Sequence, residues 1–453
     1  MSKKVLEIII LSTGIMVLAH SAYFDFRNAK INSSDLRNRV VGSRLINDGI
    51  SPYFYKWKST DPIRYYDPEN FDHLKVSNMT ATPFFHQLIH PLAEMPQWKI
   101  SRWWCAIQYL LFFAMVGMAL ILSYTNRQKG MVLIFSILFL LTDAWKMNVS
   151  NGQCYLFFPF LAMLIYFILQ KGRSMIWAPV AGLLSIVLVL TRPNALIFFI
   201  PFVFLLKNYG RRWLLSFFVP ILLLAGWTLG DRGERFFWQD YVKSLGEQIK
   251  FHQQLDPVTQ ENERDPELSE WEGIFKDNYV YYHMMSSPIK LYPENGNFFY
   301  LVNIIFHRKI PVKVFLTTLL VIIMLLTGIY YFLNRYHSLN LESGSYDLAR
   351  TALFGFGLFM ISDLFSPIFR TQYYTVQVFF PLLLAASIYQ PSFKLVYRLL
   401  LGGILLNISH IPFIKMEHTI GEYLIIGVII LFSLTRGQKM TKETRIYEQI
   451  TRE

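Results

Sequence analysis

Long apolar runs dominate this chain of 453 residues and constrain its fold more than any other feature. A run of about 20 apolar residues is long enough to cross a bilayer as a helix. Hydrophobic residues make up 53% of the chain and charged residues only 16%, against about 25% charged residues in soluble proteins. Twelve runs can be placed, at about 5–24, 103–122, 131–147, 155–170, 175–191, 194–206, 213–230, 312–333, 350–366, 373–390, 395–410 and 419–435. The sequence therefore predicts an all-α integral membrane protein with about twelve transmembrane helices, formed as a single polytopic domain over residues 1–453.

The first run, 5–24, is open to two interpretations. It follows Met-Ser-Lys-Lys and resembles the start of a signal peptide, but no small-residue cleavage motif flanks it. Its length and the many later runs favour a retained helix.

Basic residues in the short loops predict the orientation in the membrane, because Lys and Arg are enriched on the cytoplasmic side. Loops on the side of the N-terminus hold eighteen of them, including five in the tail 436–453. The opposite side holds four: Lys146, Arg192, Arg370 and Lys415. We therefore expect a multi-pass protein of the plasma (inner) membrane with both termini and the basic tail in the cytoplasm. The net charge of +12 is then explained by the basic cytoplasmic loops, which determine the topology and contact membrane lipids. Nucleic acid is therefore not an expected partner.

Two long hydrophilic stretches, 25–102 and 231–311, fall on the non-cytoplasmic side of this topology. Both mix aromatic and charged residues, as in Ser51–Trp57, and this mixture is typical of helices that lie in the membrane interface. The segment Phe298–Phe306 is apolar enough to be an interfacial helix or a short span. If it crosses the membrane, the order of the later helices is inverted.

Polar clusters at the outer ends of the spans are candidates for function, because polar groups in a membrane bundle are costly. Three of them are Asn151-Gly-Gln153, Thr191-Arg-Pro-Asn194 and Ser366–Tyr374. All three face the non-cytoplasmic compartment, so the predicted site is one-sided. The short runs 155–170 and 194–206 begin at these clusters, which indicates helices broken to admit a polar headgroup.

Single residues in these regions carry alternative interpretations. Asp35 lies about one turn beyond the first span, where it is either a general base or part of a helix N-cap with Ser34. Arg192 precedes Pro193 at a helix start, where it either binds a phosphate or extends toward the membrane interface. Arg370 is open to the same two interpretations.

The sequence does not favour a metal site. His86 and His90 have the i, i+4 spacing of metal ligands, but no third ligand accompanies them, so a helix with polar ends is the preferred interpretation. Cys105 and Cys154 both lie in apolar surroundings, and neither a disulfide nor a thiolate site is expected.

The order of the motifs resembles a known family. An aspartate just after the first span precedes a series of short motifs, namely Gly49-x-x-Pro52-Tyr53, Thr82-Pro83, Pro91-Leu-Ala-x-x-Pro96, Asn151-Gly-Gln153, Arg192-Pro193 and Ser366-Pro-Ile368. This pattern is similar to the polyprenol-phosphate-mannose-dependent mannosyltransferases, glycosyltransferase family 87 of the GT-C class, and it extends over residues 1–390.

The resemblance implies a GT-C fold and an enzyme that transfers a hexose, most plausibly mannose, from polyprenyl phosphate to a glycan or glycolipid. It implies that Asp35 is the catalytic base and that Asn151, Gln153 and Arg192 line the donor cavity. The chemistry of the donor adds Arg192 and Arg370 as the candidate cations for its phosphate. The cavity for donor and acceptor is expected to include Asn151, Gln153, Gln372, Tyr373 and Tyr53. The chain departs from the family at two places, since Arg192 replaces the common lysine and Gln372 or Tyr373 stands where the family has histidine.

The chemistry of a prenyl phosphate agrees with these residues. A phosphate is a good leaving group and needs cations rather than a general acid, while the acceptor hydroxyl needs a base. We therefore expect no cofactor beyond the lipid-linked donor, and a divalent metal is neither required nor excluded. Two alternatives are an outer-face polymerase or ligase that uses a polyprenyl-diphosphate oligosaccharide, and a flippase or transporter of lipid-linked sugar.

Overall fold

The computed structural model describes most of the predicted bundle helices and part of each long hydrophilic stretch. The described residues are 3–29, 34–67, 77, 79–171, 175–203, 210–252, 296–298, 301–302, 310–335, 344–368, 370–408 and 416–435. The tail 436–453, most of Phe298–Phe306 and the middle of the stretch 231–311 lie outside them. Within the described ranges the secondary structure is helical, with no strand.

The helices follow the predicted apolar runs closely, and each of the twelve runs overlaps a helix. The α-helices are α1 (Lys3–Ala29), α2 (Ser34–Asn47), α3 (Pro83–Leu88), α4 (His90–Ala93), α5 (Gln97–Leu122), α6 (Asn126–Leu141), α7 (Asp143–Ser150), α8 (Phe157–Lys171), α9 (Trp177–Thr191), α11 (Arg211–Gly230), α12 (Arg232–His252), α15 (Val312–Arg335), α16 (Gly344–Leu364), α17 (Phe379–Ser387), α18 (Lys394–Leu406) and α19 (Glu417–Leu434). The 3₁₀ helices are η1 (Ile63–Tyr65), η2 (Pro193–Phe199), η5 (Gln372–Val378) and η6 (Pro391–Phe393).

Four described helices are long and apolar enough to cross a membrane, namely α5 from Lys99, α11, α15 up to Leu333, and α19. A fifth span is possible if α6 and α7, which meet at an angle of 60°, are counted together. Helices α8 and α9 are apolar but shorter. The structure therefore confirms an all-helical protein with several candidate membrane spans.

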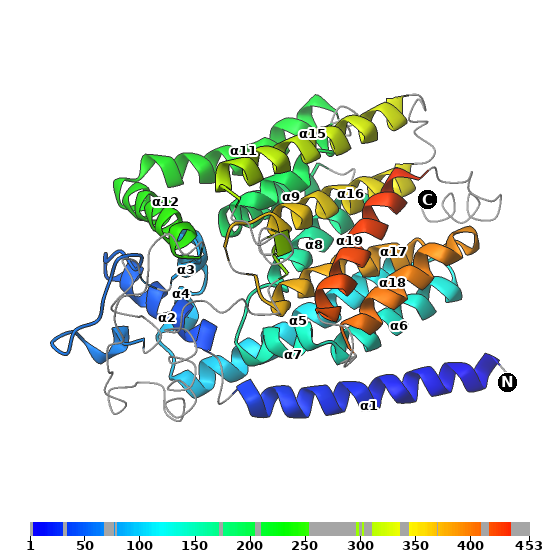
Figure 1. The fold of residues 1–453 in the computed structure, drawn as a ribbon, viewed down its shortest axis with the longest axis horizontal. Helices are drawn as coiled ribbons and strands as arrows, with labels where there is room; N and C mark the ends of the chain where they lie inside the picture. The colour runs from blue at the N-terminus through cyan, green and yellow to red at the C-terminus, as the bar shows by residue number, and fades with distance from the viewer. Residues whose placement is uncertain are drawn as a thin grey trace.

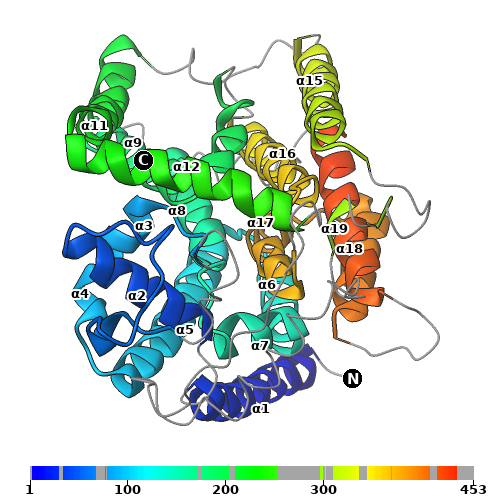
Figure 2. The ribbon, with the colours of Figure 1, turned by 60° about the vertical axis from the view of Figure 1, so that its left-hand side comes forward.

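The long helices form a bundle, and α1 begins at the same end of it as α19 ends (Figure 1). Helices α2, α3, α4 and α12 gather at the opposite end, so α12 of the stretch 231–311 lies near the described helices of the stretch 25–102. Figure 2 shows α12 lying across this end of the bundle, at a steep angle to the long helices. Aromatic rings fill the interior, where Phe379 of α17 stacks on Phe139 of α6 with 4.1 Å between centroids.

Three helix breaks place polar residues near the candidate site. Thr142 caps α7 by accepting a hydrogen bond from the Trp145 backbone N–H, and α7 then ends at Asn151. Arg192 is extended after α9, and Pro193 starts a 3₁₀ helix. The predicted span 373–390 likewise divides into η5 and α17. 3₁₀ turns take up the first part of the predicted runs 194–206 and 373–390, and the run 194–206 was expected to begin with a broken helix.

Candidate active site

Asp35 lies in the first turn of α2, where the free N–H groups of the helix stabilise a negative charge. It belongs to the helix itself, and its side chain contacts a residue far away in the chain. Its carboxylate Oδ2 accepts a hydrogen bond from Nε2 of Gln153. Its backbone N–H donates to the carbonyl of Asn151 at 3.1 Å. The structure thus brings together Asp35 and the predicted residues Asn151 and Gln153.

Hydrogen bonds fix both the backbone and the side chain of Gln153. The turn that carries it needs Gly152, whose φ is +66° and whose Cα packs against Leu36 of α2. The Gln153 backbone N–H donates to the carbonyl of Asn148 at 2.8 Å. Its carbonyl accepts from Trp104 Nε1 at 3.0 Å and Gln108 Nε2 at 3.2 Å. Only 1% of Gln153 is exposed, so its side chain has little freedom to move.

Arg39 completes this group and was not identified from the sequence. It lies one turn after Asp35 on α2, and its guanidinium donates to Gln153 Oε1 at 2.5 Å and to the Asp35 carbonyl at 2.7 Å. The i, i+4 spacing of Asp35 and Arg39 was the available signal. Burial raises the pKa of the Asp35 carboxyl above its ordinary value of 3.8, and the charges of Arg39 and Arg37 lower it in part.

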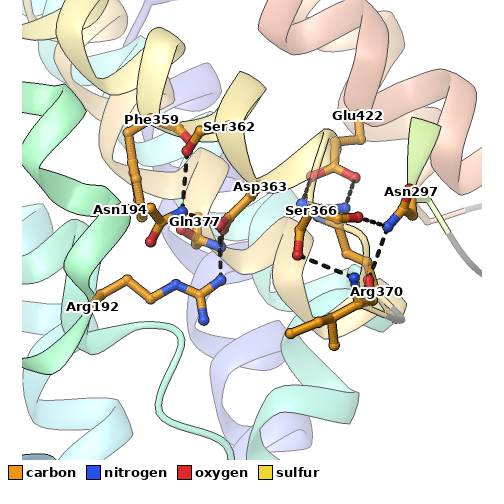
Figure 3. A network of polar contacts seen from close by, with 11 residues as sticks. Arg192, Asn194, Asn297, Phe359, Ser362, Asp363, Ser366, Arg370, Gln377 and Glu422 are labelled. Carbon is orange, nitrogen blue, oxygen red and sulfur yellow. Dashed lines mark hydrogen bonds and ion pairs between the residues drawn. The ribbon is translucent and has the colours of Figure 1, made fainter. Parts of the chain in front are cut away.

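Arg192 forms a second polar cluster around Asp363 of α16. Arg192 Nη2 donates to Asp363 Oδ1 at 2.8 Å, Asn194 Nδ2 donates to the same oxygen at 2.6 Å, and Gln377 Nε2 donates to Oδ2 at 2.9 Å. Figure 3 shows these three side chains converging on Asp363. The carboxylate is almost fully buried, whereas 23% of the Arg192 side chain is exposed.

Arg370 is placed differently from Arg192. Both of its terminal nitrogens donate to the carboxylate of Glu422 on α19, and both side chains are 2% exposed. Figure 3 shows this pair beside the Asp363 cluster, with Asn297 donating to the carbonyls of Ser366 and Ile368. The charge of Arg370 is therefore balanced by a buried carboxylate.

Tyrosine rings connect these groups. The guanidinium of Arg192 lies 5.5 Å from the ring centroids of both Tyr155 and Tyr374, and that of Arg370 lies 5.1 Å from Tyr374. Tyr155 packs against Tyr374 at 4.1 Å and against Tyr373 at 5.3 Å. Because Tyr155 follows Gln153 by two residues, one short segment touches both the Asp35 group and the Arg192 group.

The other predicted cavity residues differ in position. Gln372 and Tyr373 are half-buried at the start of η5. Tyr53 is fully buried, donates its hydroxyl to the Ala81 carbonyl at 2.9 Å, and packs against Tyr241 of α12. Tyr53 therefore supports Tyr241 by packing against its ring, and the hydroxyl of Tyr53 already forms a hydrogen bond.

His86 lies on α3 and is buried against α2. Its Nδ1 lies 3.0 Å from the carbonyl of Arg39, and burial lowers the pKa of His86 to about 4. Over the ranges that the structure describes, no three His, Cys, Asp or Glu side chains are grouped as metal ligands. Both cysteines are buried and free.

Gly152→Ala should destabilise the protein, because an added Cβ would lie 2.5 Å from the Leu36 Cβ and an L residue disfavours a φ of +66°. We expect a loss of about 1–3 kcal/mol in the free energy of unfolding. Gly130→Ala is the matched control, since it adds a Cβ to open space on α6. Thermal unfolding of both variants in detergent checks this, and equal melting temperatures would contradict it.

One family of known proteins matches part of the chain. Residues 80–264 match the family model described as glycosyltransferase family 87. This range contains Asn151, Gln153 and Arg192, while Asp35 and Arg370 lie outside it. No curated protein and no solved structure matches the chain. The family match covers about two fifths of the chain, and on a helical chain with candidate membrane spans it supports assignment to glycosyltransferase family 87 and indicates a membrane glycosyltransferase.

Proposed function

We propose that this enzyme transfers a hexose, most plausibly mannose, from polyprenyl phosphate to a glycan or glycolipid with inversion, using Asp35 as the base. The observation that carries the proposal is the position of Asp35, a half-buried carboxylate fixed by Gln153 at the end of the bundle where α2 and α12 lie. Such a carboxylate is suited to take a proton from a hydroxyl at neutral pH.

The reaction needs one proton acceptor and one cationic group. The acceptor hydroxyl oxygen forms a bond to C1 of the sugar, the bond from C1 to the phosphate oxygen breaks, and the hydroxyl proton passes to Asp35. The polyprenyl phosphate leaves with the electron pair, and its growing negative charge requires stabilisation. No divalent metal is needed for this scheme, because an arginine supplies the positive charge.

Arg192 is better placed than Arg370 to contact the phosphate. Its side chain is partly exposed, and among the described residues only its Nη2 forms a hydrogen bond. Asp363 orients it without using Nη1. Arg370 has both terminal nitrogens bonded to Glu422 in a buried position. We therefore assign the phosphate to Arg192 and the support of Tyr374 to Arg370.

The remaining site residues have supporting roles in this proposal. Asn151 and Gln153 hold Asp35, Gln372 and Tyr373 face the sugar or acceptor in place of the family histidine, and Tyr53 supports Tyr241.

We also propose a topology of about twelve spans in the plasma (inner) membrane, with both termini and the tail 436–453 cytoplasmic. The GT-C site would face the periplasm or exterior, below the stretches 25–102 and 231–311. The amphipathic helix α12 supports this arrangement, since Phe236 and Val242 are exposed on it while Glu234 and Gln248 are buried.

Transfer of radiolabelled sugar in proteoliposomes tests the function. We expect transfer from prenyl-phosphate mannose and little from a prenyl-diphosphate oligosaccharide, with activity retained in EDTA. Preference for the diphosphate would indicate a polymerase or ligase. Movement of the intact donor between leaflets without sugar transfer would indicate a flippase.

A further inference from the structure

Asp35, Gln153 and Arg39 form a closed ring of hydrogen bonds that includes the backbone carbonyl of Asp35. Gln153 Nε2 donates to the Asp35 carboxylate, Arg39 Nη2 donates to Gln153 Oε1, and Arg39 Nη1 returns to the Asp35 backbone carbonyl. Gln153 and Arg39 are 1% and 8% exposed. The ring joins the first turn of α2 to a turn that lies 114 residues further along the chain from Arg39.

Arg39 differs from the other arginines near the site in having no carboxylate of its own. Arg37 pairs with Asp67 at 3.0 Å, Arg192 pairs with Asp363 at 2.8 Å, and Arg370 pairs with Glu422. Among the described residues, Arg39 forms no ion pair within 4.0 Å. A guanidinium does not lose its proton in a protein. Arg39 therefore stays charged. Within the ring, the amide of Gln153 connects its guanidinium to the carboxylate of Asp35.

This arrangement determines which way the amide of Gln153 points. An amide can present either its oxygen or its NH₂ group to a neighbour, and the two ends have nearly the same shape. A guanidinium has only hydrogen-bond donors, so it pairs with the amide oxygen and not with the NH₂ group. With the oxygen turned to Arg39, the NH₂ group must face Asp35. Without Arg39, the amide would be free to turn its oxygen toward the carboxylate, which would repel the ionised form.

We propose that Arg39 is a positioning residue for Asp35, which it controls by fixing the orientation of the Gln153 amide. Its catalytic consequence rests on the proposed function, because it matters only if Asp35 must be ionised to accept a proton. The orientation itself does not depend on any activity.

The protonation of Asp35 is measured without turnover by its reaction with dicyclohexylcarbodiimide, to which protonated carboxyl groups add. Mass spectrometry of the peptide that contains Asp35 gives the pH midpoint of labelling. In Arg39→Met we expect the midpoint to rise by about one pH unit or more, because a nearby cation and a hydrogen-bond donor are lost together. Arg39→Lys keeps the charge and a donor, and should return the midpoint to within a few tenths of a unit of the wild type.

Two further variants complete the design. Gln153→Leu removes the amide and leaves Arg39 in place, so it should also raise the midpoint. Arg64→Met is the matched control, since Arg64 is a partly exposed arginine of the same region that pairs with Glu94. It should leave the midpoint unchanged. If Arg39→Met lacks a cooperative melting transition, the Gln153→Leu result decides, and an unshifted midpoint in that variant overturns the proposal.

The same variants in the transfer assay separate this proposal from the proposed function. We expect Arg39→Met to lower kcat and move the acid limb of its pH profile upward, with little change in KM for the donor. A shifted labelling midpoint in a protein that transfers no sugar supports the role of Arg39 and overturns the proposed function. An active wild type whose midpoint is the same in Arg39→Met overturns the role of Arg39.

Discussion

Asp35→Asn should reduce sugar transfer about 10²–10⁴-fold, which is the usual contribution of a general base. Asparagine has nearly the same shape as aspartate and can still accept the hydrogen bond from Gln153 Nε2, so the fold around α2 should be kept. It cannot accept the proton of the acceptor hydroxyl. Single-turnover transfer from a synthetic prenyl-phosphate sugar measures the effect, and near wild-type rates would exclude Asp35 as the base.

The pH profile of the wild type provides a second check on Asp35. Burial raises the pKa of this carboxyl above 3.8, so the base form is lost at a higher pH than in an exposed aspartate. The acid limb of kcat should therefore lie at a higher pH than an exposed aspartate would give, and Asp35→Asn should abolish it. Asp231→Asn is the matched control, because exposed Asp231 caps α12 through its Oδ1 and asparagine keeps that oxygen. It should leave both rate and profile unchanged.

The helical fold was predictable because the apolar residues of a membrane protein form uninterrupted runs, each long enough to cross the bilayer as a helix. Every predicted apolar run overlaps a described helix, and the ends of α5, α9 and α11 agree with the runs to within a few residues on the C-terminal side. The presence of Asp35, Asn151 and Gln153 in one region was also expected, because the predicted topology places all three on the non-cytoplasmic side. Gly152 between them carries the turn that permits the contact.

Residues that act through long-range pairing could not be assigned in the same way. Asp363 and Glu422 stand out in the sequence as carboxylates within apolar stretches, which are costly unless paired. Their partners lie 171 and 52 residues away, and no local pattern joins them. Arg370 consequently looked equivalent to Arg192, although the fold buries one and leaves the other partly exposed.

Local backbone geometry was the other gap. Hydrophobicity does not separate an α-helix from a 3₁₀ helix, so η2 and η5 were not anticipated as such. Tyr53 was placed in the cavity because it belongs to a motif, but its ring packs in a small cluster with Val41, Leu45 and Met79.

Replacing one member of the Arg370–Glu422 pair should destabilise the protein more than any other single change considered. Arg370→Met leaves the buried Glu422 carboxylate without its positive partner. Glu422→Gln leaves the buried Arg370 guanidinium without its negative partner. Each should cost about 3–5 kcal/mol in the free energy of unfolding, while Arg370→Met/Glu422→Leu should recover most of that loss. Glu247→Gln, which weakens the partly exposed pair with Lys250, is the control and should cost less than about 1 kcal/mol. Denaturant unfolding in detergent measures all four.

The double variant also decides between support of the site and direct binding of phosphate by Arg370. If Arg370 only holds Tyr374 and the segment before η5, a stable Arg370→Met/Glu422→Leu protein should keep most of its transfer activity, with donor KM within a few fold of the wild type. If Arg370 contacts the donor phosphate, the same protein should fold normally and lose activity as severely as we expect for Arg192→Met, which removes the cation proposed to bind the phosphate. A double variant no more stable than Arg370→Met would contradict the pairing itself. Stability and donor KM therefore report separately on the two roles, because Glu422 engages both terminal nitrogens of Arg370 and leaves Arg192 as the more exposed cation.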